Sequence, residues 1–142
     1  MIRLAALLLL LVVAPVRAQL LSPAEFLGYE LGERFTSHHR VMEYVAHVAQ
    51  ESPRVAMEPY GETYEGRKLV LATVATPGNL ANIDAIRRAH LGRLGMGEGN
   101  ASGGDAPAIV WLSYNVHGNE SVSSEASMEV LYRLADPDNG QA

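Results

Sequence analysis

The sequence contains no cysteine among its 142 residues. No disulfide can therefore stabilise the fold, and no thiol can act as a nucleophile or as a metal ligand. Stability must come from a packed core or from a bound metal ion.

The sequence also lacks any cluster of lysine and arginine, and its formal net charge at pH 7 is −5. Nucleic-acid binding depends on a basic patch or stripe that neutralises phosphates. An acidic chain without such a patch is not expected to bind nucleic acid.

No hydrophobic run is long enough to span a membrane. The apolar run from Leu4 to Ala14 is well short of the roughly 20 residues that cross a bilayer. It follows Arg3 and is followed by small residues around Arg17, which is the pattern of a secretory signal peptide. We therefore predict cleavage after Ala18, a secreted or periplasmic protein, and no stable membrane anchor.

Hydrophobic periodicity divides the rest of the chain into helices and strands. Val41, Tyr44 and Val48 recur at helical spacing, with Arg40, Glu43 and His47 expected on the outer face. Runs rich in β-branched residues predict strands, and Gly, Pro and Asn mark the turns between them. The predicted elements are a helix over 37–50, a hairpin of strands 54–60 and 68–75, a helix from 79 to about 94, a glycine-rich loop over 95–105, a buried strand over 108–116, and a final helix with an apolar stripe formed by Val122, Ala126, Val130, Leu131 and Leu134. This alternation indicates an α/β domain.

The segment His117-Gly118-Asn119-Glu120 lies where the predicted buried strand gives way to the final helix. Ligands of open α/β sheets bind outside the carboxyl ends of the strands. An imidazole and a carboxylate three residues apart can close on one zinc ion, but catalytic zinc needs three protein ligands and an open position. A second interpretation is that Glu120 is only a favourable charge in the first helical turn and that His117 is a loop residue.

The remaining histidines do not suggest a third ligand. His38 and His39 are consecutive and would point about 100° apart on a helix. His47 is expected on the polar face of its helix, and His90 lies in the middle of another. We predict that all four are structural or surface residues. Ser121, Ser123 and Ser124 lie near His117 without a nucleophile elbow, so helix capping is expected of them.

The order of these motifs resembles the opening of an M14-type zinc carboxypeptidase domain. The hairpin segment from Tyr60 to Arg67 contains Glu65-Gly66-Arg67, and a strand, a helix and then the His-x-x-Glu motif follow it. The resemblance extends from about Arg34 to Ala135. It implies a mixed, mostly parallel sheet flanked by helices, with zinc as cofactor and with His117 and Glu120 as the first two zinc ligands.

The resemblance also implies a domain organisation. Residues 1–18 would be the signal peptide, residues 19–33 an N-terminal lead-in, and residues 34–142 the N-terminal portion of a zinc carboxypeptidase-like domain. In that family a third ligand, His, and a general-base Glu lie far downstream of the His-x-x-Glu motif. No catalytic residue is therefore assigned within this chain. We expect the chain to be truncated and inactive alone. A full-length parent would hydrolyse peptide bonds.

Two alternatives to a secreted zinc metallocarboxypeptidase stay open. The motif His-Gly-Asn-Glu is also similar to that of zinc-dependent amino-acid deacylases of the aspartoacylase and succinylglutamate desuccinylase type. Digestive carboxypeptidases have Arg where this chain has Asn119. The Glu-Gly-Arg hairpin and the export signal favour the peptidase, with a peptide or protein substrate. The other alternative is a non-catalytic secreted globular module, and no sequence feature fixes the oligomeric state.

Overall fold

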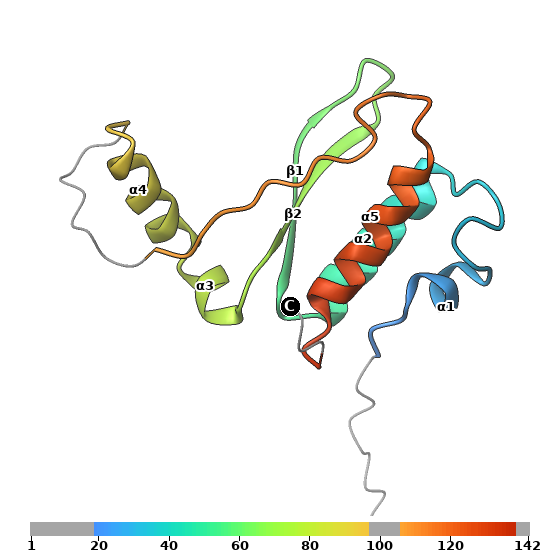
Figure 1. Ribbon diagram of the computed structural model, residues 1–142, viewed down its shortest axis with the longest axis horizontal. Helices are drawn as coiled ribbons and strands as arrows, with labels where there is room; N and C mark the ends of the chain where they lie inside the picture. Colours follow the sequence, from blue (N-terminus) through green and yellow to red (C-terminus); the bar gives the residue numbers. More distant parts are fainter. Residues whose placement is uncertain (1–18, 97–105, 139–142) are drawn as a thin grey trace, which may run out of the picture.

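The computed structural model describes residues 19–96 and 106–138, which form a helical layer against a β-hairpin (Figure 1). The hairpin consists of β1 (Val55–Glu62) and β2 (Lys68–Val74). Helices α2 (His38–Glu51) and α5 (Val122–Ala135) pack side by side, and α2 contacts β1 while α5 contacts β2. The predicted signal peptide, most of the predicted glycine-rich loop and residues 139–142 lie outside the described residues.

The predicted hairpin is confirmed. Its strands pair antiparallel, with Val55 opposite Val74 and Glu62 opposite Lys68. The turn is closed by the Thr63 N–H, which donates to the Arg67 carbonyl at 2.8 Å, and by Gly66 with a positive φ of 74°. Glycine adopts this left-handed conformation without the steric penalty of a β-carbon.

The core lies between α2 and α5. Tyr44 and Val48 of the predicted stripe are fully buried, so the amphipathic helix is confirmed. The Tyr44 hydroxyl donates to the Leu21 carbonyl at 3.0 Å, and burial raises the pKa of this phenol. Among residues 19–96 and 106–138, the buried hydrophobic residues of the core are Leu27, Tyr44, Val48, Val55, Met128, Leu131 and Ala135.

The buried face of α5 differs from the predicted stripe. Met128, Leu131 and Ala135 are buried, whereas Val122 and Ala126 are exposed. The buried face shares only Leu131 with the predicted stripe, because α2 contacts α5 from a different side. Local hydrophobicity does not specify the direction of the partner helix. Glu125 lies on the same buried face, three residues before Met128.

The N-terminal lead-in packs onto α2 through the short helix α1 (Pro23–Leu27). Ser22 and Glu25 form a reciprocal capping box at the start of this helix. The ring of Phe26 lies 5.2 Å from that of Tyr44 and 5.2 Å from that of His47, and the His47 Nε2 atom accepts from the Leu21 N–H at 3.1 Å.

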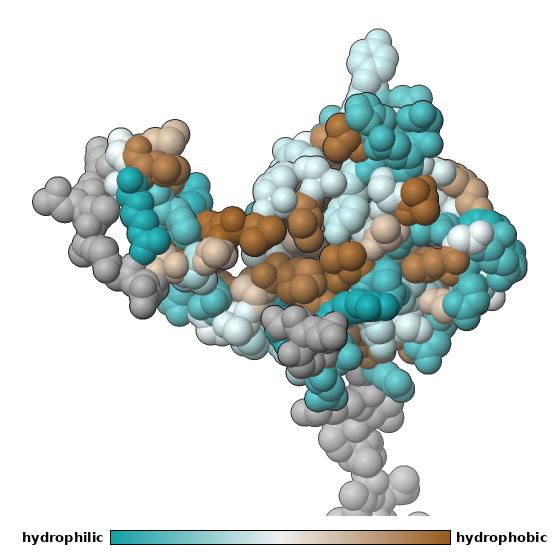
Figure 2. Space-filling view, viewed as in Figure 1, coloured by the Kyte–Doolittle hydropathy of each residue, from teal (hydrophilic) through white to brown (hydrophobic). Residues whose placement is uncertain are grey.

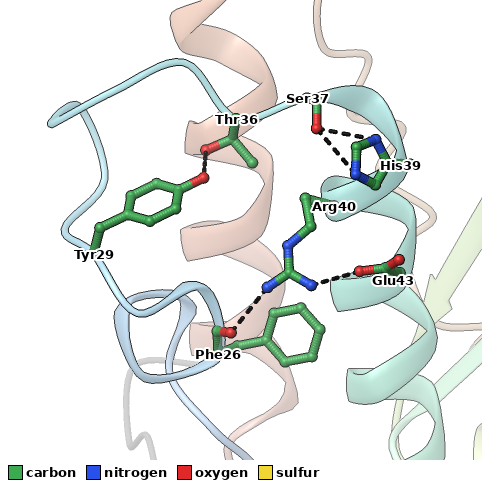
Figure 3. Close-up of polar contacts among 7 residues, drawn as sticks. All are labelled: Phe26, Tyr29, Thr36, Ser37, His39, Arg40 and Glu43. Carbon is green, nitrogen blue, oxygen red and sulfur yellow. Dashed lines mark hydrogen bonds and ion pairs between the residues drawn. The ribbon is translucent and has the colours of Figure 1, made fainter.

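The prediction that Arg40 and His47 lie on an outer face of α2 is therefore wrong. Arg40 donates to the Phe26 carbonyl at 3.2 Å and to the Glu43 carboxylate at 2.6 Å (Figure 3). Both side chains are only partly exposed, because α1 covers this side of the helix.

The predicted helix from 79 to about 94 is divided in two. Thr76 accepts from the Asn79 N–H and begins α3 (Pro77–Ala81), and α4 (Ile83–Arg93) follows after a break at Asn82. Neither helix has a buried residue, and Figure 1 shows both standing to one side of the layer formed by α2 and α5. Their apolar residues therefore do not form part of the core.

The predicted buried strand over 108–116 does not form. In the described part of the chain these residues pair with no strand, and Val110 and Trp111 are 76% and 68% exposed. The reason is that a strand requires a neighbouring backbone to pair with. Between this segment and β2 lies an apolar groove of about 630 Å³, and Figure 2 shows hydrophobic residues across the middle of the molecule. Its lining includes Val45, Val70, Ala72, Val110, Leu112 and Leu131.

The α/β class is confirmed, but the sheet is smaller than the resemblance implies. Within residues 19–96 and 106–138 the sheet has two antiparallel strands and no parallel pair. In the same ranges, no helix is both long enough and apolar enough to cross a bilayer.

Candidate metal centre

The structure brings His117 and Glu120 together. Residues 117–120 form a tight turn in which the Glu120 N–H donates to the His117 carbonyl at 3.0 Å. The turn places the Nδ1 atom of His117 2.9 Å from the Oε1 atom of Glu120. The three-residue spacing is therefore sufficient to make the two side chains converge.

The turn is fixed to the start of α5. Glu120 precedes the N-cap residue Ser121, so the prediction that it lies within the first helical turn is wrong. Its carbonyl accepts from the Ser123 N–H at 3.0 Å and from the Ser123 hydroxyl at 2.8 Å. The Ser121 side chain makes no capping hydrogen bond, so Ser123 holds the turn instead. On the other side, Asn115 turns the chain toward His117 with a positive φ of 56°, a conformation that Asn tolerates.

The distance between the two side chains suits adjacent ligands of one zinc ion. Zinc binds His nitrogen and carboxylate oxygen at about 2.0–2.1 Å in a tetrahedron, which separates two ligand atoms by roughly 3.3 Å. The observed separation of 2.9 Å would need to widen by only about 0.4 Å. The side chains of His117 and Glu120 are 72% and 49% exposed, so solvent leaves room for this movement and for further ligands. These two residues fit a zinc ion as an incomplete ligand set.

The other histidines lie elsewhere. His38 and His39 are exposed at the start of α2, where His39 contacts the Ser37 hydroxyl at 3.0 Å (Figure 3). His90 contacts the Pro107 carbonyl at 2.8 Å. His47 accepts from the Leu21 N–H and packs against the Phe26 ring of α1. Among the residues that the structure describes, no three His, Asp or Glu side chains are close enough to hold a metal ion. In the described part of the chain, His117 and Glu120 are therefore the two candidate ligands that lie together.

One buried acidic residue near the candidate centre was not predicted from the sequence. Glu125 is 8% exposed, and its carboxylate accepts from the Gly32 N–H at 2.6 Å, the Thr36 N–H at 3.2 Å and the Thr36 hydroxyl at 2.7 Å. A carboxylate is rarely buried unless donors surround it. The spacing of Glu125 to Met128 and Leu131 on one helical face is the signal that could have revealed it.

Comparison with known proteins identifies the family. A sequence model described as zinc carboxypeptidase matches residues 41–141, a range that contains the hairpin, His117, Glu120 and α5. No match was found among curated proteins or among solved structures. The family match supports a hydrolase of the zinc carboxypeptidase kind and implies zinc as the cofactor. Because the match covers most of its length, the chain belongs to the zinc carboxypeptidase family.

Proposed function

We propose that the protein is a secreted or periplasmic zinc metallocarboxypeptidase that hydrolyses peptide bonds in peptide or protein substrates. His117 and Glu120 are two of its zinc ligands. The observation that carries the proposal is the 2.9 Å approach of the His117 Nδ1 and Glu120 Oε1 atoms within the range matched by the family. Zinc at such a site supplies Lewis acidity that polarises a scissile carbonyl and lowers the pKa of water.

Residues next to His117 and Glu120 orient the two proposed ligand side chains. The turn at Gly118 and Asn119 and the hydrogen bonds from Ser123 to the Glu120 carbonyl orient the two ligand side chains. A His nitrogen and a carboxylate bind metal only when deprotonated, so the ring proton shared with Glu120 must leave on metal binding. The Asn119 amide can donate a hydrogen bond to substrate but supplies no positive charge to a developing oxyanion.

The proposal includes groups outside the printed sequence. We expect the third ligand, a His, and the general-base Glu downstream of the printed residues, and the resemblance to the family supports this part of the proposal. In the same proposal the 142 residues alone do not catalyse hydrolysis, because two ligands without a base do not make a catalytic zinc centre.

The test uses the full-length parent and a peptide with a blocked N-terminus and a free C-terminal residue. We expect zinc-dependent release of the C-terminal amino acid, its loss on addition of a chelator, and its loss in His117→Ala and Glu120→Ala. His39→Ala is the matched control, because His39 is an exposed histidine with a side-chain hydrogen-bond partner at the start of α2. Activity that resists chelation, or that survives His117→Ala, would refute the proposal.

The same preparation distinguishes the alternatives. Hydrolysis of N-acetylated or N-succinylated amino acids without release of C-terminal residues from peptides would identify a deacylase. Absence of hydrolysis of either substrate by the zinc-loaded protein would identify a non-catalytic module.

A further inference from the structure

The chain segment that precedes the candidate ligands is exposed and contributes no buried residue. Every residue from 107 to 122 is exposed, including His117 and Glu120. The buried residue nearest to Glu120 along the described sequence is Glu125, in the first turn of α5. After Glu120, the contacts of Glu125 are therefore the first buried contacts that connect this part of the chain to the rest of the fold.

A hydrogen-bond chain from the N-terminal region surrounds the Glu125 carboxylate. The Thr36 hydroxyl has one proton and donates it to Glu125, so the Tyr29 hydroxyl, 3.0 Å away, donates to Thr36 (Figure 3). The guanidinium of Arg34 covers the Tyr29 ring at 4.5 Å from its centroid. Gly32 donates its N–H to the second carboxylate oxygen. The segment from Tyr29 to Thr36 is thus fastened to the beginning of α5.

We propose that Glu125 is a positioning residue for the metal centre. It holds the first turns of α5, the Ser123 N–H and hydroxyl hold the Glu120 carbonyl, and the Glu120 N–H holds the His117 carbonyl. Through these bonds the segment from Tyr29 to Thr36 determines how well the His117 and Glu120 side chains converge. The effect on zinc rests on the proposed function, whereas the effect on the turn is a property of the folded chain.

Three variants separate this role from general stabilisation. Thr36→Val keeps the shape of the side chain but removes the hydroxyl that donates to Glu125, and Thr36→Ser restores it. Glu125→Gln keeps the shape of the carboxylate but replaces one acceptor oxygen with a donor.

Ser52→Ala is the matched control. The Ser52 hydroxyl is also buried and donates to the Ala135 carbonyl at 2.9 Å, at the opposite end of α5. At about 1.5 Å per helical residue, this contact is roughly 20 Å from Glu120. It destabilises the same helix without touching the segment that Glu125 holds.

The first measurement is amide hydrogen exchange of Glu120 and Ser123 in the metal-free full-length protein. Loss of a hydrogen bond to a charged group changes a local opening equilibrium by about tenfold. We expect exchange to accelerate by about this factor in Thr36→Val and Glu125→Gln, and to stay near wild type in Thr36→Ser and Ser52→Ala. Equal acceleration in Ser52→Ala, or none in Thr36→Val, would overturn the proposal.

The second measurement is the zinc dissociation constant of the same proteins, with His117→Ala as the reference for loss of a ligand. We expect Thr36→Val to weaken zinc binding by about tenfold and Ser52→Ala to leave it unchanged. Unchanged binding in Thr36→Val beside a large loss in His117→Ala would overturn the positioning role. If His117→Ala has no effect, the proposed function fails, and hydrogen exchange alone decides the role of Glu125.

Discussion

Replacing Met128 with alanine tests whether the contact between α2 and α5 provides most of the stability. Met128 is fully buried and packs in the cluster that contains Tyr44, Val48 and Leu131. Removal of a buried Met side chain typically costs about 2–5 kcal/mol, through lost burial and the cavity left behind. Two helices and a hairpin border this site, so we expect incomplete collapse and a loss of about 3 kcal/mol. This is a large part of the roughly 5–15 kcal/mol that stabilises a typical domain.

The assay is urea unfolding followed by far-ultraviolet circular dichroism. With a slope of about 2 kcal/mol per molar urea, the midpoint should fall by about 1.5 M. Met57→Ala is the matched control, because Met57 on β1 is 38% exposed and its loss should change stability by about 0.5 kcal/mol or less. Met128→Leu conserves volume and should lose less than about 1.5 kcal/mol, which keeps the comparison possible if the alanine variant does not fold. Equal midpoint shifts for Met128→Ala and Met57→Ala would refute the assignment of the core.

Three further predictions concern the N-terminal region and the metal. The Ser22 hydroxyl and backbone N–H lower the pKa of Glu25 below 4.5, so its contribution to stability is present above that pH and is lost as the pH falls through the lower pKa of the folded state. The melting temperatures of wild type and Glu25→Gln, measured as a function of pH, should therefore converge in acid, and a difference that grows in acid would contradict the capping role. Equilibrium dialysis of the 142-residue chain should show no zinc retention tighter than about micromolar, and tight stoichiometric zinc would mean that another residue completes the site. N-terminal sequencing of the exported protein should begin at Gln19, and retention of the leader would contradict the predicted cleavage.

Local patterns predicted the elements whose geometry depends on neighbouring residues. The spacing of Val41, Tyr44 and Val48 identified α2, and the turn residues before Arg67 identified the hairpin. The approach of His117 to Glu120 could also be predicted from the sequence, because one tight turn over residues 117–120 is enough to create it.

Which residues are buried could not be predicted from the sequence in the same way. The run over 108–116 has the composition of a strand but pairs with no described strand, since pairing needs a second backbone that composition does not supply. Arg40 and His47 look like surface residues on an isolated helix, but α1 covers them.

The sequence by itself determined the family motif, helix α2, the β-hairpin and the approach of His117 to Glu120, because each is encoded within a short stretch of consecutive residues. Only the tertiary structure decided which face of α5 is buried and that Glu125 receives donors from Gly32 and Thr36, separated from it in sequence by 93 and 89 positions. Such contacts depend on which distant segments meet after folding, and the periodicity of a single helix does not contain that information.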